Sequence, residues 1–208
     1  MIALAFFRSG RILGIPDGGK MIIRRIRMKI LNIYTDGACS NNQKEENAGG
    51  WGAILEYGDN SKELYGGEAN TTNNRMEMTA LVEALSALKR DGLTIRVFSD
   101  STYLMSCFQN KWYVSWQKKG WKTSGNTPVK NKDLWIRLLS LTEKHEISFY
   151  IVKGHVNVLK EEQLTKEYSR FCEKNGVSFS YEEFKYIITM NNRADELANI
   201  GMAPYKPT

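Results

Sequence analysis

The hydrophobic pattern of the chain predicts a sheet with two kinds of strand connection. Apolar runs rich in β-branched and aromatic residues indicate strands at 29–35, 51–57, 62–69, 94–99 and 146–152. Gly58, Asp59 and Asn60 lie between the second and third runs and are typical of a hairpin turn. The first three strands should therefore be antiparallel neighbours, whereas helical segments separate the last two and indicate parallel crossovers. We predict an α/β fold with a mixed five-stranded sheet flanked by helices.

Apolar residues at helical spacing predict the flanking helices, over about 74–89, 101–118 and 131–144. A helical hairpin is indicated over about 157–189. The first helix of this hairpin has an apolar stripe made of Leu164, Tyr168 and Phe171. A stop signal at 174–176 and a capping box formed by Ser180 and Glu183 separate it from the second. A last helix follows the hairpin.

Four acidic residues stand where a charge is costly. Asp36 and Asp100 follow apolar strands, and Asp195 falls in the first turn of the last predicted helix. Glu77 lies on the apolar stripe of its helix, and no Lys or Arg is placed to pair with it along that helix. An Asp after a strand or at a helix start is commonly a turn or cap residue, so only Glu77 is hard to explain without a ligand. A bound cation is the alternative explanation for all four.

Composition and charge restrict the class of protein. With 208 residues, 42% hydrophobic and 25% charged, the chain can form one substantial core. Cys39, Cys107 and Cys172 are an odd number without a CxxC pair, so neither a disulfide framework nor a zinc site is indicated and a reducing cytoplasm is expected. Most of the net charge of +6 lies in residues 1–28, so the overall pI says little about nucleic-acid binding.

A local basic stretch at 109–133 is more informative, because it holds six lysines and one acid interleaved with aromatic residues. Lysines neutralise phosphates and flat rings pack on sugars or bases, so this pattern is typical of a site for a nucleic-acid strand. Trp112 and Trp116 are also spaced as neighbours on one helix face, where tryptophans equally often pack in a core. Both interpretations remain open for the tryptophans.

Six motifs in order resemble those of the type 1 ribonuclease H family, whose members cut the RNA strand of an RNA–DNA hybrid. They are TDGAC, TTNNRMEM, SDSTY, WKTSGNTPVKNKDLW, VKGH and NNRADELA. The resemblance runs from about Lys29 to Met202 and leaves out the hairpin, an insertion of about 157–189 where compact members have a short loop. It implies a ribonuclease H-like fold over 29–208 and an endonuclease that leaves 5′-phosphate and 3′-hydroxyl ends.

The resemblance also implies the catalytic residues. Four carboxylates hold two Mg²⁺ ions in this family, and the matching positions are Asp36, Glu77, Asp100 and Asp195. Two cations roughly 3.5–4 Å apart activate a water and stabilise the leaving oxyanion, and oxygen ligands suit Mg²⁺, with Mn²⁺ as the alternative. Clustered carboxylates should have raised pKa values until metal binds. His155 matches a loop histidine thought to shuttle a proton or assist product release.

Substrate contacts are implied in the same way. The positions that read ribose 2′-hydroxyls are matched by Cys39, Asn42, Asn73 and Asn74. Contacts to a DNA-strand phosphate are matched by Thr72 and Asn131. The basic protrusion that grips the DNA strand is matched by Trp112, Trp116, Lys118, Lys119, Trp121 and Lys122. A helix N-cap is the alternative role for the adjacent asparagines Asn73 and Asn74.

The insertion carries nearly equal numbers of basic and acidic residues, so phosphate binding is not its indicated role. We expect it to pack beside the active site and to steady the loop that bears His155. Deleting 158–188 with a short linker should then alter turnover more than hybrid affinity.

Residues 1–28 are expected to be a basic extension that is disordered or an over-long start, since Met21 and Met28 lie just before the domain. A transit peptide is the alternative, and the apolar runs are too short to span a membrane. We therefore expect a cytoplasmic monomer without a membrane partner. A non-catalytic hybrid-binding module is the alternative function, although it would not need four acids. A reverse-transcriptase-type domain is a third possibility, but the chain has no polymerase segment.

Overall fold

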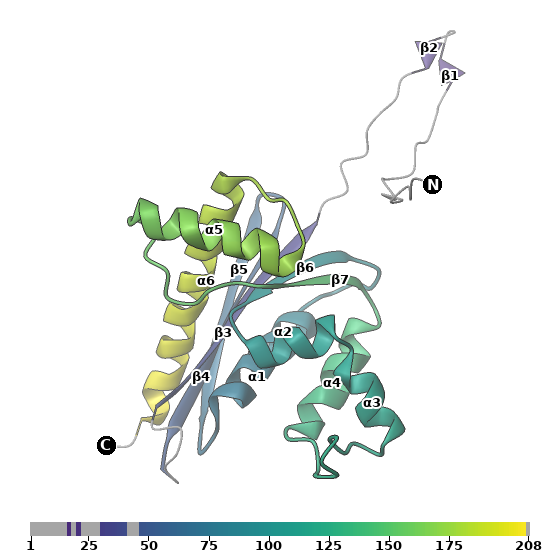
Figure 1. Cartoon of the computed structure of the whole chain (residues 1–208), viewed down its shortest axis with the longest axis vertical. Helices are drawn as coiled ribbons and strands as arrows, with labels where there is room; N and C mark the ends of the chain where they lie inside the picture. The colour runs from purple at the N-terminus through teal and green to yellow at the C-terminus, as the bar shows by residue number, and fades with distance from the viewer. Residues whose placement is uncertain (1–15, 18–19, 22–29, 41–45, 207–208) are drawn as a thin grey trace.

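A mixed five-stranded sheet lies at the centre of the computed structural model, which describes residues 16–17, 20–21, 30–40 and 46–206 (Figure 1). The strand order is β5-β4-β3-β6-β7. These strands are β3 (Leu31–Ser40), β4 (Ala48–Tyr57), β5 (Asn60–Ala69), β6 (Thr94–Ser99) and β7 (Glu146–Ile151). The first three are antiparallel neighbours, and β6 and β7 add in parallel beyond β3. The predicted sheet is confirmed. A separate ladder pairs β1 (Pro16–Asp17) with β2 (Lys20–Met21).

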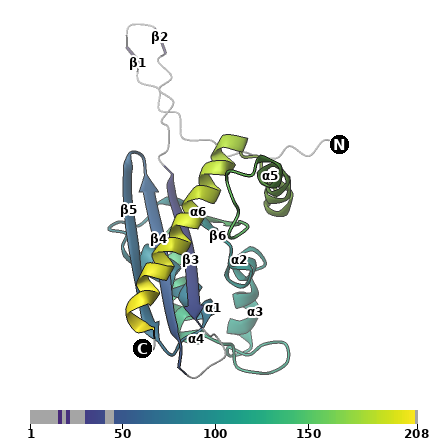
Figure 2. The same ribbon diagram turned by 90° about the vertical axis from the view of Figure 1, so that its left-hand side faces the viewer.

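Helices cover both faces of the sheet (Figure 2). They are α1 (Asn73–Ser86), α2 (Thr102–Gln109), α3 (Trp112–Lys118), α4 (Lys132–Thr142), α5 (Glu161–Asn175) and α6 (Tyr181–Met202), followed by the short η1 (Ala203–Tyr205). Side chains alternate across a strand, so Ile33 joins the core that α1, α2 and α4 share, while Tyr34 joins the core beneath α5 and α6. The sheet therefore has one hydrophobic core on each side.

Two elements differ from the sequence prediction. β3 continues to Ser40 because its last residues pair with the start of β4, so Asp36 lies inside the strand and not after it. The single helix predicted over 101–118 is interrupted at Lys111, whose φ of 53° is left-handed and cannot continue an α-helix. The chain turns there and begins α3 as a separate helix.

The predicted hairpin is present, but its second arm is not a separate helix. Ser180 caps it as expected, since its side chain accepts a hydrogen bond from the Glu183 backbone nitrogen at 3.1 Å. No Gly or Pro interrupts the following residues until Gly201, so α6 runs unbroken from Tyr181 to Met202. Asp195 therefore lies deep inside this helix, and the prediction that it occupies a first turn is wrong.

The expectations for residues 1–28 fall outside the described residues, apart from the β1–β2 ladder. None of the described helices has a stretch long and apolar enough to cross a bilayer.

Candidate active site

The site is organised around Asp36, which sits in the middle of β3 with 5% of its surface exposed. The Gly37 backbone nitrogen donates a 2.7 Å hydrogen bond to one of its carboxylate oxygens. Gly52 stands opposite it on β4. Its side chain also shares a hydrogen bond with the carboxyl of Asp100, a second acid that cannot compensate a buried negative charge.

Two glycines let the acid-bearing helices approach this point. A Cβ on Gly37 would lie 2.3 Å from the Glu77 backbone nitrogen, so α1 packs directly on β3 only because that side chain is absent. A Cβ on Gly52 would lie 2.2 Å from the Ala194 carbonyl oxygen, so α6 packs on β4 for the same reason. Glu77 and Asp195 are thereby brought to β3 from opposite faces of the sheet.

Glu77 is held at the boundary between α1 and α2. Asn73 donates a 2.8 Å hydrogen bond to one of its carboxylate oxygens, and the Ser101 hydroxyl donates a short hydrogen bond to the other. Ser101 is also the N-cap of α2, accepting from the Leu104 backbone nitrogen at 3.3 Å. The side chain that fixes Glu77 therefore follows directly after Asp100.

The loop after β7 closes the site from the other side. A Cβ on Gly154 would lie 2.0 Å from a carboxylate oxygen of Asp100, so the loop backbone rests on that acid. The His155 Nδ1 atom is 3.6 Å from a carboxylate oxygen of Asp195, and 76% of the His155 side chain is exposed. An exposed imidazole at the rim is placed to exchange protons with solvent.

Electrostatics links these acids into one cluster. Burial, and then the nearby charge of Asp100, raise the pKa of Asp36 to about 9. Burial raises the pKa of Glu77 to about 7, although hydrogen bonds from Ser101 and Asn73 work against it. Burial raises the pKa of Asp100, and the neighbouring His155 lowers it in part. The expected rise in pKa is thus found for Asp36, Glu77 and Asp100, and desolvation contributes more to it than repulsion.

These residues fit a divalent cation by their chemistry. Carboxylate oxygens are the ligands that Mg²⁺ prefers. Without a cation, the repulsion between the carboxylates is relieved by protonation, whereas a bound cation would offset it directly. Among the described residues, however, no three Asp, Glu, His or Cys side chains stand as ligands around one point. The acids converge, but their side chains are not arranged as a closed metal cage.

The predicted 2′-hydroxyl readers lie around the start of α1. The Cys39 thiol donates to the Thr71 carbonyl oxygen at 3.6 Å, and Asn73 reaches Glu77. The N-cap of α1 is Thr72, which accepts from the Arg75 backbone nitrogen at 3.3 Å, and not the adjacent asparagines. Asn42 lies outside the described residues.

A cavity of about 250 Å³ separates α1 from the segment before α4. Asn74 and Asn131 line it together with Tyr103, Trp116 and Lys130. Asn131 precedes α4 with a left-handed φ of 54°, and its side chain does not cap the helix. Three predicted substrate contacts, Asn74, Trp116 and Asn131, thus line the same hollow, together with Lys130.

The open question about the tryptophans is answered differently for each one. Trp116 packs edge-on against the buried Trp135 with ring centroids 5.5 Å apart, and Trp121 is half-buried against the same core. Trp112 remains 39% exposed. Core packing thus accounts for Trp116 and Trp121, while Trp112 offers a free face beside the exposed lysines Lys118, Lys119 and Lys122.

Comparison with known proteins gives the family. The ribonuclease H family model matches residues 28–164. Ribonuclease H of Hahella chejuensis is 45% identical over 175 residues, which is 84% of this chain and 95% of that protein. The chain belongs to the ribonuclease H family. Hydrolysis of phosphodiester bonds and use of divalent metals are general to that family.

Two solved structures share the ribonuclease H fold with this chain. LC9-RNase H1, described as a type 1 RNase H with the type 2 active-site motif, has a TM-score of 0.55 at 24% identity, covering 83% of this chain and 87% of that one. LC11-RNase H1, solved in complex with an RNA/DNA hybrid, has a TM-score of 0.52 at 18% identity, covering 84% of this chain and 97% of that one.

The family match ends inside α5, before the helix that carries Asp195. In this ribonuclease H, two asparagines that the sequence did not single out form hydrogen bonds to the segment from β7 to the His155 loop. The Asn175 side chain accepts from the Ile151 backbone nitrogen at 2.8 Å and donates to the Ile151 oxygen at 2.9 Å. The Asn192 side chain donates to the Val156 oxygen at 2.9 Å. The pair of asparagines in the NNRADELA motif could have indicated Asn192. The sequence pattern indicates Asn175 only as part of a stop signal at the end of a helix.

Proposed function

We propose that this ribonuclease H hydrolyses the RNA strand of RNA–DNA hybrids with two Mg²⁺ ions, or Mn²⁺ as the alternative, held by Asp36, Glu77, Asp100 and Asp195. The observation that carries the proposal is the buried cluster of the first three acids, whose pKa values are all raised by burial. Such a cluster is costly in a protein that only binds, and it suits a site that gathers positive charge.

Each side chain has a role that its surroundings support. When bound, the cations supply an activated water and stabilise the leaving 3′ oxyanion, which gives 5′-phosphate and 3′-hydroxyl ends. Asp36 offers a carboxylate from β3, and Asp100 offers one from the position directly after β6, the parallel neighbour of β3. Ser101 and Asn73 hold both oxygens of Glu77 in place. His155, exposed beside Asp195, shuttles a proton or assists product release.

We assign recognition of the RNA strand and of the DNA strand to two surfaces, one on each side of α1. Cys39, Asn42, Asn73 and Asn74 are assigned to the RNA 2′-hydroxyls, which both donate and accept hydrogen bonds. Thr72 and Asn131 are assigned to a DNA-strand phosphate, and the protrusion formed by α3 and the following loop to the DNA strand beyond it. The cavity that Asn74 and Asn131 share supports a contact point near the start of α1.

A non-catalytic hybrid-binding module is the competing class. The test incubates a labelled RNA–DNA hybrid with Mg²⁺ and the full chain, its Asp36→Asn and Asp100→Asn variants, and Lys89→Gln as a surface control. We expect the wild type and control to cleave the RNA strand, and either Asn variant to lose activity by about a thousandfold or more. Cleavage that survives in both Asn variants would refute the metal assignment, and no cleavage by the wild type would favour the binding module.

A cytoplasmic location and a monomeric state belong to the same proposal. The cytoplasmic location is supported by the three cysteines, which are all free thiols, as expected in a reducing compartment.

A further inference from the structure

The insertion places one helix, α5, across the front of the molecule. Its inner face is apolar, with Leu164 and Phe171 buried in the core that α6 shares. Its outer face carries Lys166, Arg170 and Lys174, spaced four residues apart and all exposed. We call these three residues the basic face of α5.

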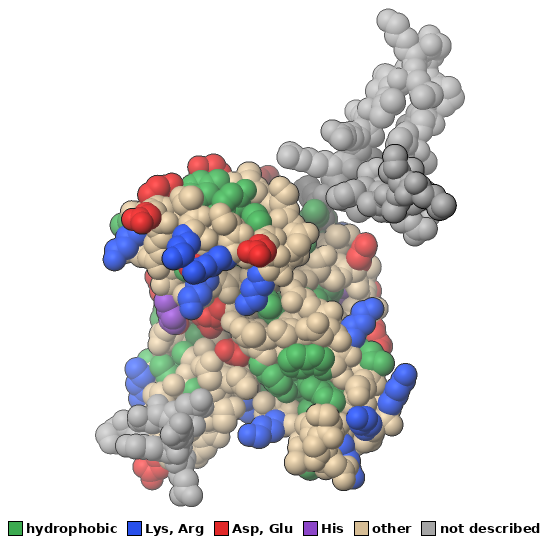
Figure 3. Space-filling model, in the orientation of Figure 1, with side chains coloured by type: hydrophobic (Ala, Val, Ile, Leu, Met, Phe, Trp, Pro, Cys, Tyr) green, Lys and Arg blue, Asp and Glu red, His purple; other side chains and the backbone are tan. Residues whose placement is uncertain are grey.

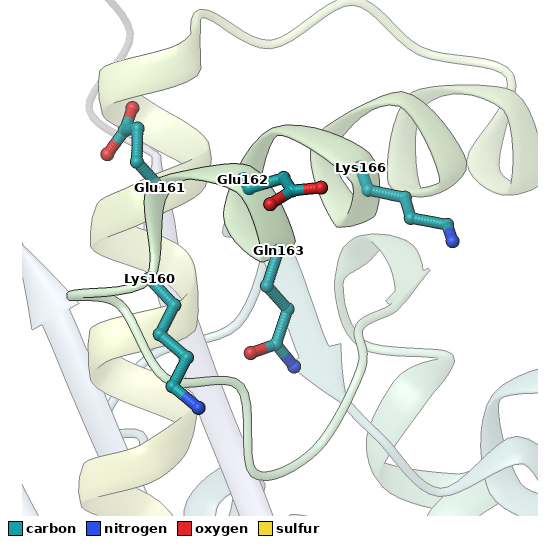
Figure 4. Close-up of a pocket in the computed structure, with 5 residues that line it drawn as sticks. All are labelled: Lys160, Glu161, Glu162, Gln163 and Lys166. Carbon is teal, nitrogen blue, oxygen red and sulfur yellow. The ribbon is translucent and has the colours of Figure 1, made fainter.

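The near balance of charge over the insertion conceals this arrangement, because three of its basic residues share one side of α5, with Glu167 among them. Figure 4 shows Glu161 pointing away from Lys160 and Gln163, which point to the same side of the ribbon. Glu161 is occupied on its side by a 2.6 Å hydrogen bond from the Tyr181 hydroxyl. On the basic face Glu167 pairs with Arg170. Glu162 lines the same hollow as Lys166, but among the described residues neither Lys166 nor Lys174 forms an ion pair. The argument from net charge against phosphate binding therefore does not hold for this face.

The lysines of this surface are free to bind an anion. Within the described residues every ion pair uses an arginine or a histidine as its cation, and none uses a lysine. The same is true of the lysines on α3, which the proposed function assigns to the DNA strand. Figure 3 shows basic side chains gathered along α5 beside a histidine and acidic groups. Unpaired lysines on one face suit a polyanion better than a solvated helix of mixed sign.

The basic face continues into the active site. A groove of about 270 Å³ lies between α5 and the end of β7. Its charged lining is Lys153, Arg170 and Lys174 together with Glu167, the ion-pair partner of Arg170. Phe171 and Ile151 add apolar lining to the groove. Lys153 stands two residues before His155, and the intervening Gly154 rests on Asp100. A nucleic-acid strand that extends from the acidic cluster on this side would therefore enter the groove directly.

We infer that the basic face of α5, with Lys153, binds the phosphate backbone of the same hybrid duplex, at the end of the site opposite α3. The inference rests on the proposed function and extends its substrate surface. In Figure 1 α5 lies at the upper left and α3 at the lower right, and in Figure 2 both helices lie to the right of the sheet, with α5 above α3. From Lys166 to Lys174 the helix rises about 12 Å, which corresponds to roughly three or four nucleotide steps of one strand.

Charge reversal on this face is the direct test. The variant Lys166→Glu, Arg170→Glu, Lys174→Glu is compared with Lys62→Glu, Lys89→Glu, Lys144→Glu, which makes the same change in net charge at exposed positions outside the proposed binding surfaces. Binding of a fluorescent hybrid is measured in a chelating buffer across a salt series, so that no cleavage occurs. We expect the α5 variant to bind about tenfold more weakly at low salt, with a salt slope lower by about two to three. The control variant should keep the wild-type slope.

A milder variant and a second readout keep the outcomes separate. Lys166→Gln with Lys174→Gln leaves the Arg170–Glu167 pair intact and should lower the salt slope by about one to two. If both α5 variants bind the hybrid with the same affinity and salt slope as the control, the inference is overturned. An acidic protein would then be the alternative partner for the basic face of α5. Cleavage of the hybrid by the wild type in Mg²⁺ is scored in parallel. Its loss would sink the proposed function, while the binding data would still decide the role of α5.

Discussion

At the scale of single residues, the least comfortable group in the molecule is the carboxyl of Asp36. It is buried inside a strand, receives one backbone hydrogen bond, and has its pKa raised to about 9. An ordinary Asp has a pKa near 4. In the absence of a cation the folded protein therefore keeps a proton at this position that the unfolded chain releases above about pH 4.

This difference fixes the sign of a pH effect. A group with a raised folded-state pKa contributes stability below its unfolded pKa of about 4 and loses that contribution as the pH rises through about 9. Glu77 adds a smaller effect of the same sign, which is lost as the pH rises through about 7. The metal-free protein should become less stable between about pH 4 and pH 9.

We predict that Asp36→Asn, which should be inactive, is more stable than the wild type at about pH 8 without divalent cations, by about 1–3 kcal/mol. The amide is neutral at every pH, so folding of the variant requires neither the uptake of a proton at this position nor the burial of a charge. Urea unfolding in a chelating buffer at several pH values measures the effect. Asp59→Asn in the exposed β4–β5 turn is the control. A variant less stable than the wild type at that pH would contradict the electrostatic account.

The sequence was sufficient to select these acids but not to describe their surroundings. An acid on the apolar stripe of a helix already marks Glu77 as buried, because helical periodicity is local information. That Asp36 lies inside β3 depends on pairing with β4, and that Ser101 holds Glu77 depends on where α2 meets α1. Both are consequences of tertiary packing, which no pattern along the chain encodes.

At the scale of elements, the insertion and the catalytic loop are joined by polar contacts. Asn175 forms two hydrogen bonds with Ile151 at the outer edge of β7, in the way that a further strand would. Asn192, on α6, holds the carbonyl of Val156, next to His155. Asn175 thus joins the hairpin to the strand that leads into the loop, whereas the contact to the loop itself comes from α6 beyond the predicted insertion of 157–189. That the hairpin steadies the loop stays a prediction.

Asn192→Ala is predicted to lower turnover by roughly three- to tenfold, the equivalent of one hydrogen bond, with little change in KM. The pH profile of turnover should shift as well, because the loop positions the imidazole of His155. Thr189→Ala, which loses a hydrogen bond within the same helix, is the matched control and should match the wild type. A change in KM alone would show that Asn192 does not position the loop.

Deleting 158–188 is a poor test of the same idea. The deletion would remove the first turns of α6 together with Phe184, Ile187 and Ile188, which are buried in the core. Loss of several such side chains costs several kcal/mol and would unfold a domain of ordinary stability. The sequence did not reveal this, because the hairpin looked separable as long as α6 was taken for two helices.

At the scale of the whole molecule, charge is divided between regions with different roles. Residues 1–28 carry +5 of the net +6, and they precede the sheet, which begins at Leu31. The basic surfaces of α3 and α5 belong to the folded part. We therefore assign long-range attraction to any nucleic acid to residues 1–28, and specific placement of a hybrid to the folded part of the chain.

A chain that starts at Met28 should keep the unfolding midpoint and the turnover of the full chain. Its affinity for double-stranded DNA without RNA should fall, and that binding should become less dependent on salt, since fewer counterions are released. Thermal unfolding and a salt titration on the two chains measure these effects. A clear drop in the unfolding midpoint would mean that residues before Met28 contribute to the fold.

The order of elements along the chain also sets the order in which the site is assembled. β3, β4 and β5 are neighbours in sequence and in the sheet, whereas Asp195 arrives on α6, the last long helix of the described chain. Local pairings form before distant ones, and nascent domains fold from the N-terminus. The sheet can therefore form before the last of these acids is present. The electrostatic repulsion of the completed cluster is then met only at the final docking step, when the rest of the core already holds the chain together.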